Sequence, residues 1–122
     1  MLSLNSIGKN LQLSYSSVSF NTGKIMISRQ QTLKTLQRFK TENGSEYGIV
    51  SLGVFGSLAR DEATEGSDVD VVVETKGANL FQLVHMKEQL ETLLNAHVDI
   101  VRKRQNMNPF LKKRIEQDAV YV

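Results

Sequence analysis

Two short motifs, separated by ten residues, combine the residue types that bind phosphate and metal ions. The first is Gly56-Ser57, which follows an apolar run and precedes a short polar stretch. Glycine permits a tight turn and a close backbone approach to a ligand, and the free N–H groups at a helix start favour anions. The second is Asp68 and Asp70, with one valine between them, at the start of another apolar run. Alternate residues of a strand point to one face, so these carboxylates are expected to form a hard-oxygen site for magnesium.

This combination fits the transfer of a nucleotidyl group. The reaction needs an attacking oxygen, an α-phosphorus and a leaving pyrophosphate in line, and positioning and metal electrostatics supply most of the catalysis. Asp68 and Asp70 would hold magnesium at the triphosphate, while Gly56 and Ser57 would grip the β and γ phosphates.

A third carboxylate would have to come from a neighbouring strand, and Asp99 is the candidate that the apolar pattern places on one. There it would complete a second metal site and draw the proton from the attacking hydroxyl. The alternative for Asp99 is a solvated strand position. Arg60 stands one turn beyond Ser57 and would either add a bidentate phosphate contact, pair with Glu62 or Glu65, or lie in water.

The elements that must position these residues can be predicted from apolar spacing and capping signals. Ser28, with a glutamine three residues later, opens a polar-rich helix that Asn43-Gly44 is expected to end. The mostly apolar run at residues 47–55 predicts a central strand covered on both faces, and this strand leads directly into Gly56.

Further along the chain, residues 80–95 predict a helix, residues 97–101 a third strand, and Pro109 the start of a last helix. Residues 119–122 are expected to add an edge strand. The helix at residues 80–95 should turn one apolar stripe toward the core, formed by Leu83, Met86, Leu90 and Leu93.

Length and composition indicate one globular domain. The chain has 122 residues, of which 40% are hydrophobic and 23% charged, and its net charge of +2 implies no general affinity for nucleic acid. It has no cysteine, which removes disulfides, thiolate catalysis and thiolate metal sites. No apolar run approaches the roughly 20 residues of a membrane span, and the N-terminus does not resemble a signal peptide. We therefore expect a soluble, cytoplasmic protein.

Residues 1–27 differ from the rest of the chain because they are rich in serine and asparagine and contain no acidic residue. Their apolar alternation slips in phase, so we expect disorder or a weakly attached hairpin here, in preference to an integral strand. Met26 stands just before the first predicted helix, and natural translation from Met26 is a hypothesis that intact mass would test.

A basic cluster occupies the last quarter of the sequence. A cluster of this kind is usually a solvated face, but it could contact triphosphate, an acidic partner surface or RNA. No series of aromatic residues accompanies it, so we expect no direct nucleic-acid binding. The cluster consists of Lys103, Arg104, Lys112, Lys113 and Arg114.

The spacing of Gly56-Ser57 and Asp68-Val69-Asp70 resembles the signature of the DNA polymerase beta-like nucleotidyltransferase superfamily. The strings at residues 56–60 and 67–70 are similar to those of its minimal nucleotidyltransferase (MNT) branch, and the downstream Asp99 matches as well. The similarity covers residues 28–122 in length and element order, which we take as the minimal nucleotidyltransferase domain.

The resemblance implies an α/β (α+β) fold with a small mixed β-sheet flanked by helices, as in the palm of these polymerases. It implies a two-metal magnesium site, ATP as the nucleotide, and a HEPN-domain RNase toxin as partner in a hetero-oligomer. It also implies residue roles: Gly56, Ser57 and Arg60 bind nucleotide, whereas Asp68, Asp70 and Asp99 bind metal and catalyse.

Three classes of function share these residues. The first is a magnesium-dependent enzyme that transfers AMP from ATP to a tyrosine hydroxyl of a HEPN toxin and so acts as its antitoxin. The second is an antitoxin that neutralises its partner by binding alone, and the third is a small-molecule nucleotidyltransferase. The intact carboxylates favour the first class over the second, and the chain is short for the acceptor pocket that the third needs.

Overall fold

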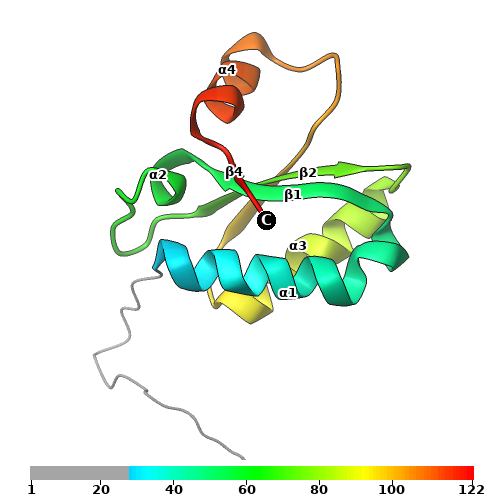
Figure 1. Ribbon diagram of the computed structural model, residues 1–122, viewed down its shortest axis with the longest axis horizontal. Coiled ribbons are helices and arrows are strands. Elements are labelled where there is room, and N and C mark those ends of the chain that lie inside the picture. The colour runs from blue at the N-terminus through cyan, green and yellow to red at the C-terminus, as the bar shows by residue number, and fades with distance from the viewer. Residues whose placement is uncertain (1–27) are drawn as a thin grey trace, which may run out of the picture.

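The computed structural model describes residues 28–122, which form a four-stranded mixed sheet with helices on both faces (Figure 1). The expected α/β class with a small mixed sheet is confirmed. The expectations for residues 1–27 lie outside the described residues. In chain order the elements are α1 Arg29–Tyr47, β1 Ile49–Phe55, α2 Gly56–Ala59, β2 Val69–Thr75, α3 Leu80–Leu94, β3 Val98–Arg102, α4 Pro109–Asp118 and β4 Val120–Tyr121.

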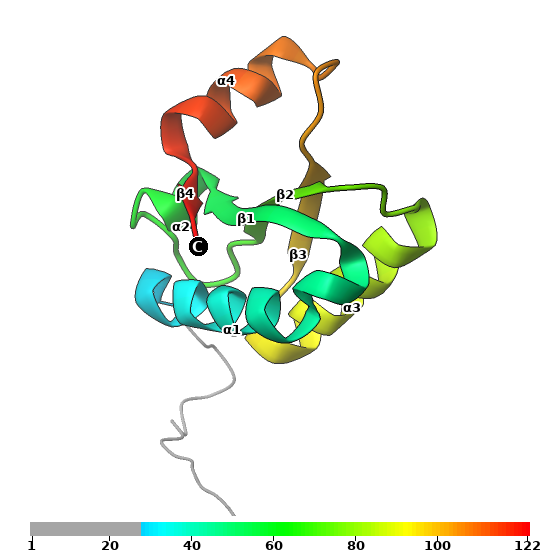
Figure 2. The ribbon, with the colours of Figure 1, turned by 45° about the vertical axis from the view of Figure 1, so that its right-hand side comes forward.

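The strands lie in the order β3-β2-β1-β4. β1 runs antiparallel to both β2 and β4, whereas β2 and β3 are parallel, because α3 connects them as a crossover. Helices α1 and α3 lie on one side of the sheet and α4 on the other (Figures 1 and 2). The central position predicted for the first strand and the edge position predicted for the last are both confirmed.

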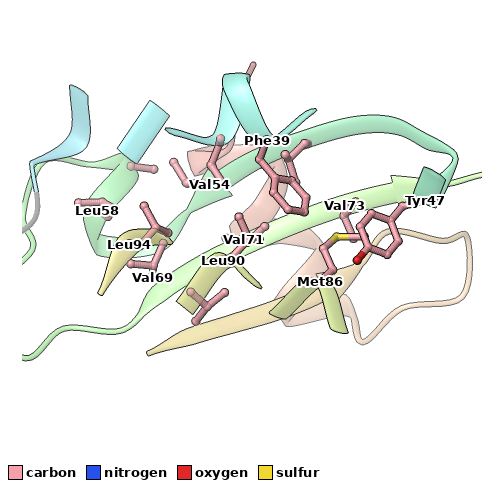
Figure 3. Packing of buried hydrophobic residues seen from close by; sticks show 14 residues of the cluster. Phe39, Tyr47, Val54, Leu58, Val69, Val71, Val73, Met86, Leu90 and Leu94 are labelled. Atoms are coloured by element: carbon pink, nitrogen blue, oxygen red, sulfur yellow. The ribbon is translucent and has the colours of Figure 1, made fainter. Parts of the chain in front are cut away.

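The main core lies between the sheet and the pair α1 and α3 (Figure 3). On this face Val69, Val71 and Val73 alternate into the core, as the pattern of β2 predicts. A smaller apolar cluster lies on the opposite face, where Phe55 and Val72 pack against Ile115 of α4. Asp70 and Glu74 of β2 share that second face with Val72, because alternate residues of a strand point the same way.

The end of α1 differs from the prediction. The helix continues past Asn43-Gly44 to Tyr47 and ends at Gly48, which has a left-handed φ of 64° and donates its N–H to the carbonyls of Gly44 and Ser45. Tyr47 is only 3% exposed and lies in the main core, so tertiary packing holds the last turn of α1 despite the glycine within that turn. As a result β1 begins at Ile49.

The apolar stripe of α3 is correct for Leu83, Met86 and Leu90 but wrong for Leu93, which is 55% exposed. Leu94 takes the place in the core, because it stands a full four residues after Leu90 on the same helical face. Among residues 28–122 no helix has the length and apolar character needed to cross a membrane.

Candidate active site

The site begins where β1 turns into α2. Gly56 makes this turn with a φ of 76°, a conformation that residues with a side chain rarely adopt. A Cβ at Gly56 would stand 2.3 Å from Oδ2 of Asp70, so the missing side chain also lets this carboxylate lie against the turn. Ser57, the next residue, is the second residue of α2 and remains partly exposed.

Two of the predicted carboxylates, Asp70 and Asp99, lie on the same face of the sheet. Asp70 is the register partner of Phe55 in β1 and of Asp99 in β3, and paired residues of adjacent strands point to the same face. Asp68 stands just before β2, two residues from Asp70. Asp68 and Asp99 are exposed, while the side chain of Asp70 is 22% exposed. The parallel register thus brings Asp99 beside Asp70, as the sequence predicted.

The charges at this place favour a cation. Burial raises the pKa of Asp70 above its ordinary value; Arg114 lowers it, and the negative charges of Asp99 and Asp68 raise it further. A carboxylate in this position is therefore stabilised as an anion when positive charge lies next to it.

The donor set fits magnesium in its chemistry, since it consists of carboxylate oxygens only. Within residues 28–122, no three acidic or histidine side chains already converge into a ready-made metal site. Like charges repel, so ionised carboxylates on one face stand apart unless a cation lies among them. We conclude that the residues present suit a divalent ion. Asp70 is the central one, because it is next to Asp68 along the chain and next to Asp99 across the sheet.

Arg60 caps the C-terminal end of α2 and holds two carboxylates. Its Nε donates to Glu62 at 2.9 Å and its Nη1 to Asp118 at 2.6 Å. The sequence offers Glu62 as one partner of Arg60, whereas Asp118 has no local signal, because α4 brings it to α2 from the far end of the sequence. The assignment of Arg60 to phosphate binding stays a prediction.

Arg114 is a residue of this site that the sequence did not single out. Its Nη2 lies 3.8 Å from Oδ2 of Asp70, and its Cζ lies 5.5 Å from the ring centroid of Phe55. In the sequence it is one of five residues of the basic cluster. Nothing in the pattern separates it from the others, because its position depends on how α4 crosses the sheet.

Comparison with known proteins agrees with this geometry. Residues 36–122 match the family model of the nucleotidyltransferase domain. The chain belongs to this family. The prediction that it is a nucleotidyltransferase enzyme of this superfamily is thereby confirmed.

Related sequences are named for one reaction. The protein adenylyltransferase MntA of Thermococcus cleftensis is 34% identical over 98 residues, which cover 80% of this chain and 98% of that protein. A candidate protein adenylyltransferase of Methanocaldococcus jannaschii is 36% identical over 88 residues, covering 71% of this chain and 90% of the relative.

Solved structures share the fold. A candidate minimal nucleotidyltransferase superimposes with a TM-score of 0.63 at 34% identity, covering 77% of this chain and 95% of that one. The MNT antitoxin complex with a tri-AMPylated HEPN toxin of Shewanella oneidensis matches with a TM-score of 0.58 at 16% identity, covering 76% of this chain and 70% of that one. At that identity the second match shows the fold alone.

Proposed function

We propose that this protein transfers AMP from ATP to a tyrosine hydroxyl of a HEPN-type toxin and acts as the antitoxin of the pair. The observation that carries the proposal is the register of β2 and β3, which sets Asp99 beside Asp70 next to the turn at Gly56. The names of the relatives and the AMPylated toxin in the complex of similar fold support the reaction and the partner.

In this proposal each residue acts on a different part of the reactants. The backbone N–H groups that follow Gly56, with the hydroxyl of Ser57, bind the β and γ phosphates. The α-phosphorus then lies on the side of the three carboxylates, Asp68, Asp70 and Asp99. The acceptor hydroxyl attacks that phosphorus, the bond to pyrophosphate breaks, and Asp99 takes the hydroxyl proton. Asp99 suits this task because it is exposed at the edge strand β3, where a second protein can approach.

Asp68, Asp70 and Asp99 would hold the magnesium ions, which when bound would neutralise charge on the triphosphate and on the developing transition state. The neighbouring carboxylates already work against the ionised form of Asp70, since Asp99 and Asp68 raise its pKa. The choice of ATP rests on the family and on an ATP analogue, AMP-PNP, in a toxin–antitoxin complex of the same fold.

The decisive experiment incubates the full chain with magnesium, ATP and a HEPN toxin and weighs the toxin. Wild type should add AMP units, and Asp99→Asn should slow the transfer by about 10²-fold or more while ATP still binds. Glu88→Gln is the matched control, because it removes an exposed negative charge from α3 outside the site.

Two results would contradict the proposal. One is the absence of any AMP on the toxin with wild-type protein. The other is full protection of cells by an Asp68→Ala, Asp70→Ala double variant that transfers nothing, which would indicate neutralisation by binding alone.

A further inference from the structure

We propose that Arg114 is a triphosphate-binding residue of this site, which lies over Asp70 in the nucleotide-free protein and moves to the phosphates when a metal ion binds. The inference rests on the proposed binding of a metal–nucleotide complex. It predicts that Arg114 weakens the binding of the metal ion alone and strengthens the binding of the metal ion with nucleotide.

The backbone of Arg114 is held in place by packing, whereas its guanidinium group is partly exposed and weakly bound. The next residue, Ile115, is only 4% exposed and packs with Phe55 and Val72, which holds this turn of α4 on the sheet. The guanidinium lies over the ring of Phe55, and its side chain is 54% exposed. Its 3.8 Å separation from Asp70 is too long for a hydrogen bond, so a loose ion pair and the contact with the Phe55 ring are what its movement has to break.

Arg60, the other arginine near the site, is bound differently. It donates hydrogen bonds at 2.9 and 2.6 Å to Glu62 and Asp118, and both would have to break before it could turn to a phosphate. Among residues 28–122, Arg114 makes a 3.8 Å ion pair with Asp70 and a contact with the Phe55 ring, and no hydrogen bond of this kind. The structure therefore favours Arg114 over Arg60 as the arginine that is free to follow the ligand.

A metal ion and Arg114 compete for the same carboxylate. The positive charge of Arg114 already acts on Asp70, and a divalent ion at Asp70 would repel a guanidinium held in that place. Triphosphate oxygens reverse this balance, because a planar guanidinium binds phosphate in a bidentate manner. Arg114 should therefore weaken the binding of metal alone and strengthen the binding of metal with nucleotide.

The test compares two binding constants in the full chain. Mn²⁺ alone is titrated by its electron paramagnetic resonance signal, and a magnesium complex of ATP with a methylene α–β bridge is titrated by calorimetry. Arg114→Met should bind Mn²⁺ about threefold more tightly because one repelling charge is gone. It should bind the nucleotide complex about tenfold more weakly, the size of one lost charge-assisted contact.

Lys113→Met is the matched control, because it removes the same charge from the neighbouring, exposed position of α4 and should change neither constant in this opposed way. Arg114→Lys keeps the positive charge but loses the planar, bidentate guanidinium. It should bind Mn²⁺ as wild type does and bind the nucleotide complex more weakly. Circular dichroism and thermal unfolding of each variant check that α4 is still packed.

The outcomes separate this inference from the proposed function. Wild-type protein that binds neither Mn²⁺ nor the nucleotide complex would contradict the proposed function itself. If wild type binds both, and Arg114→Met lowers both affinities together or leaves both unchanged, the inference about Arg114 is wrong and the proposed function stands.

Discussion

Substitution of Gly56 by alanine tests the contact that links the turn to the carboxylates. The new Cβ would meet Oδ2 of Asp70 at 2.3 Å and its Cγ at 3.3 Å. The obstacle is the end of a side chain and not backbone, so the carboxylate can move away while the sheet stays intact. We expect the variant to fold and to lose its activity.

The magnitudes follow from the geometry. The left-handed φ of 76° should cost alanine about 1–2 kcal/mol of folding free energy. A displaced rotamer of Asp70 should add about 0.5–1.5 kcal/mol. To reach an ordinary contact distance the carboxylate must retreat by about 1 Å, and a misplacement of that size in a catalytic group costs about 10²-fold in rate.

Gly66 provides the matched control. It has a similar φ of 79°, but a Cβ there would meet no atom within 4 Å. Gly66→Ala should therefore lose about 1–2 kcal/mol in urea unfolding, with the rate of AMP transfer to the toxin unchanged. Two results would contradict this steric role of Gly56: AMP transfer by Gly56→Ala as fast as by Gly66→Ala, or failure of Gly56→Ala to fold.

Two further predictions concern the elements that hold the site. Gly53→Ala would set a Cβ 2.5 Å from the backbone oxygen of Val120, so we expect β4 to separate from β1, seen as faster amide exchange in β4; unchanged exchange would contradict this. Hydrogen bonds from Lys87 and from the backbone N–H of Val98 lower the pKa of Glu91 in the folded protein. These bonds therefore stabilise the fold at pH values above the ordinary pKa near 4.5, and this stability is lost as pH falls through the lower pKa of the folded state. Glu91→Gln should flatten that acid-induced decrease of the melting temperature, and an equally steep decrease would count against the assignment.

The sequence predicted the helices and strands well where the signal is local. Turn residues, strand alternation and caps are read within a few positions, which is why Gly56 and Asp70 were found together. The end of α1 was missed because Tyr47 is held by the core, which no local pattern reveals. Arg114 was missed for a similar reason, since its contact with Asp70 joins β2 to α4 across 44 positions of the chain.

The register of β3 against β2 is the feature on which the candidate site most depends. A slip of one residue would turn Asp99 to the opposite face, toward the main core. Contacts at the start of β3 oppose such a slip: the N–H of Val69 donates to the carbonyl of His97 at 2.8 Å, and the N–H of Val98 donates to Glu91 at 3.1 Å. Glu91 lies on α3, so the crossover helix itself fixes where β3 begins. The backbone positions of Asp70 and Asp99 are therefore set by the fold, and a cation bound in the proposed site would only have to draw their side chains together.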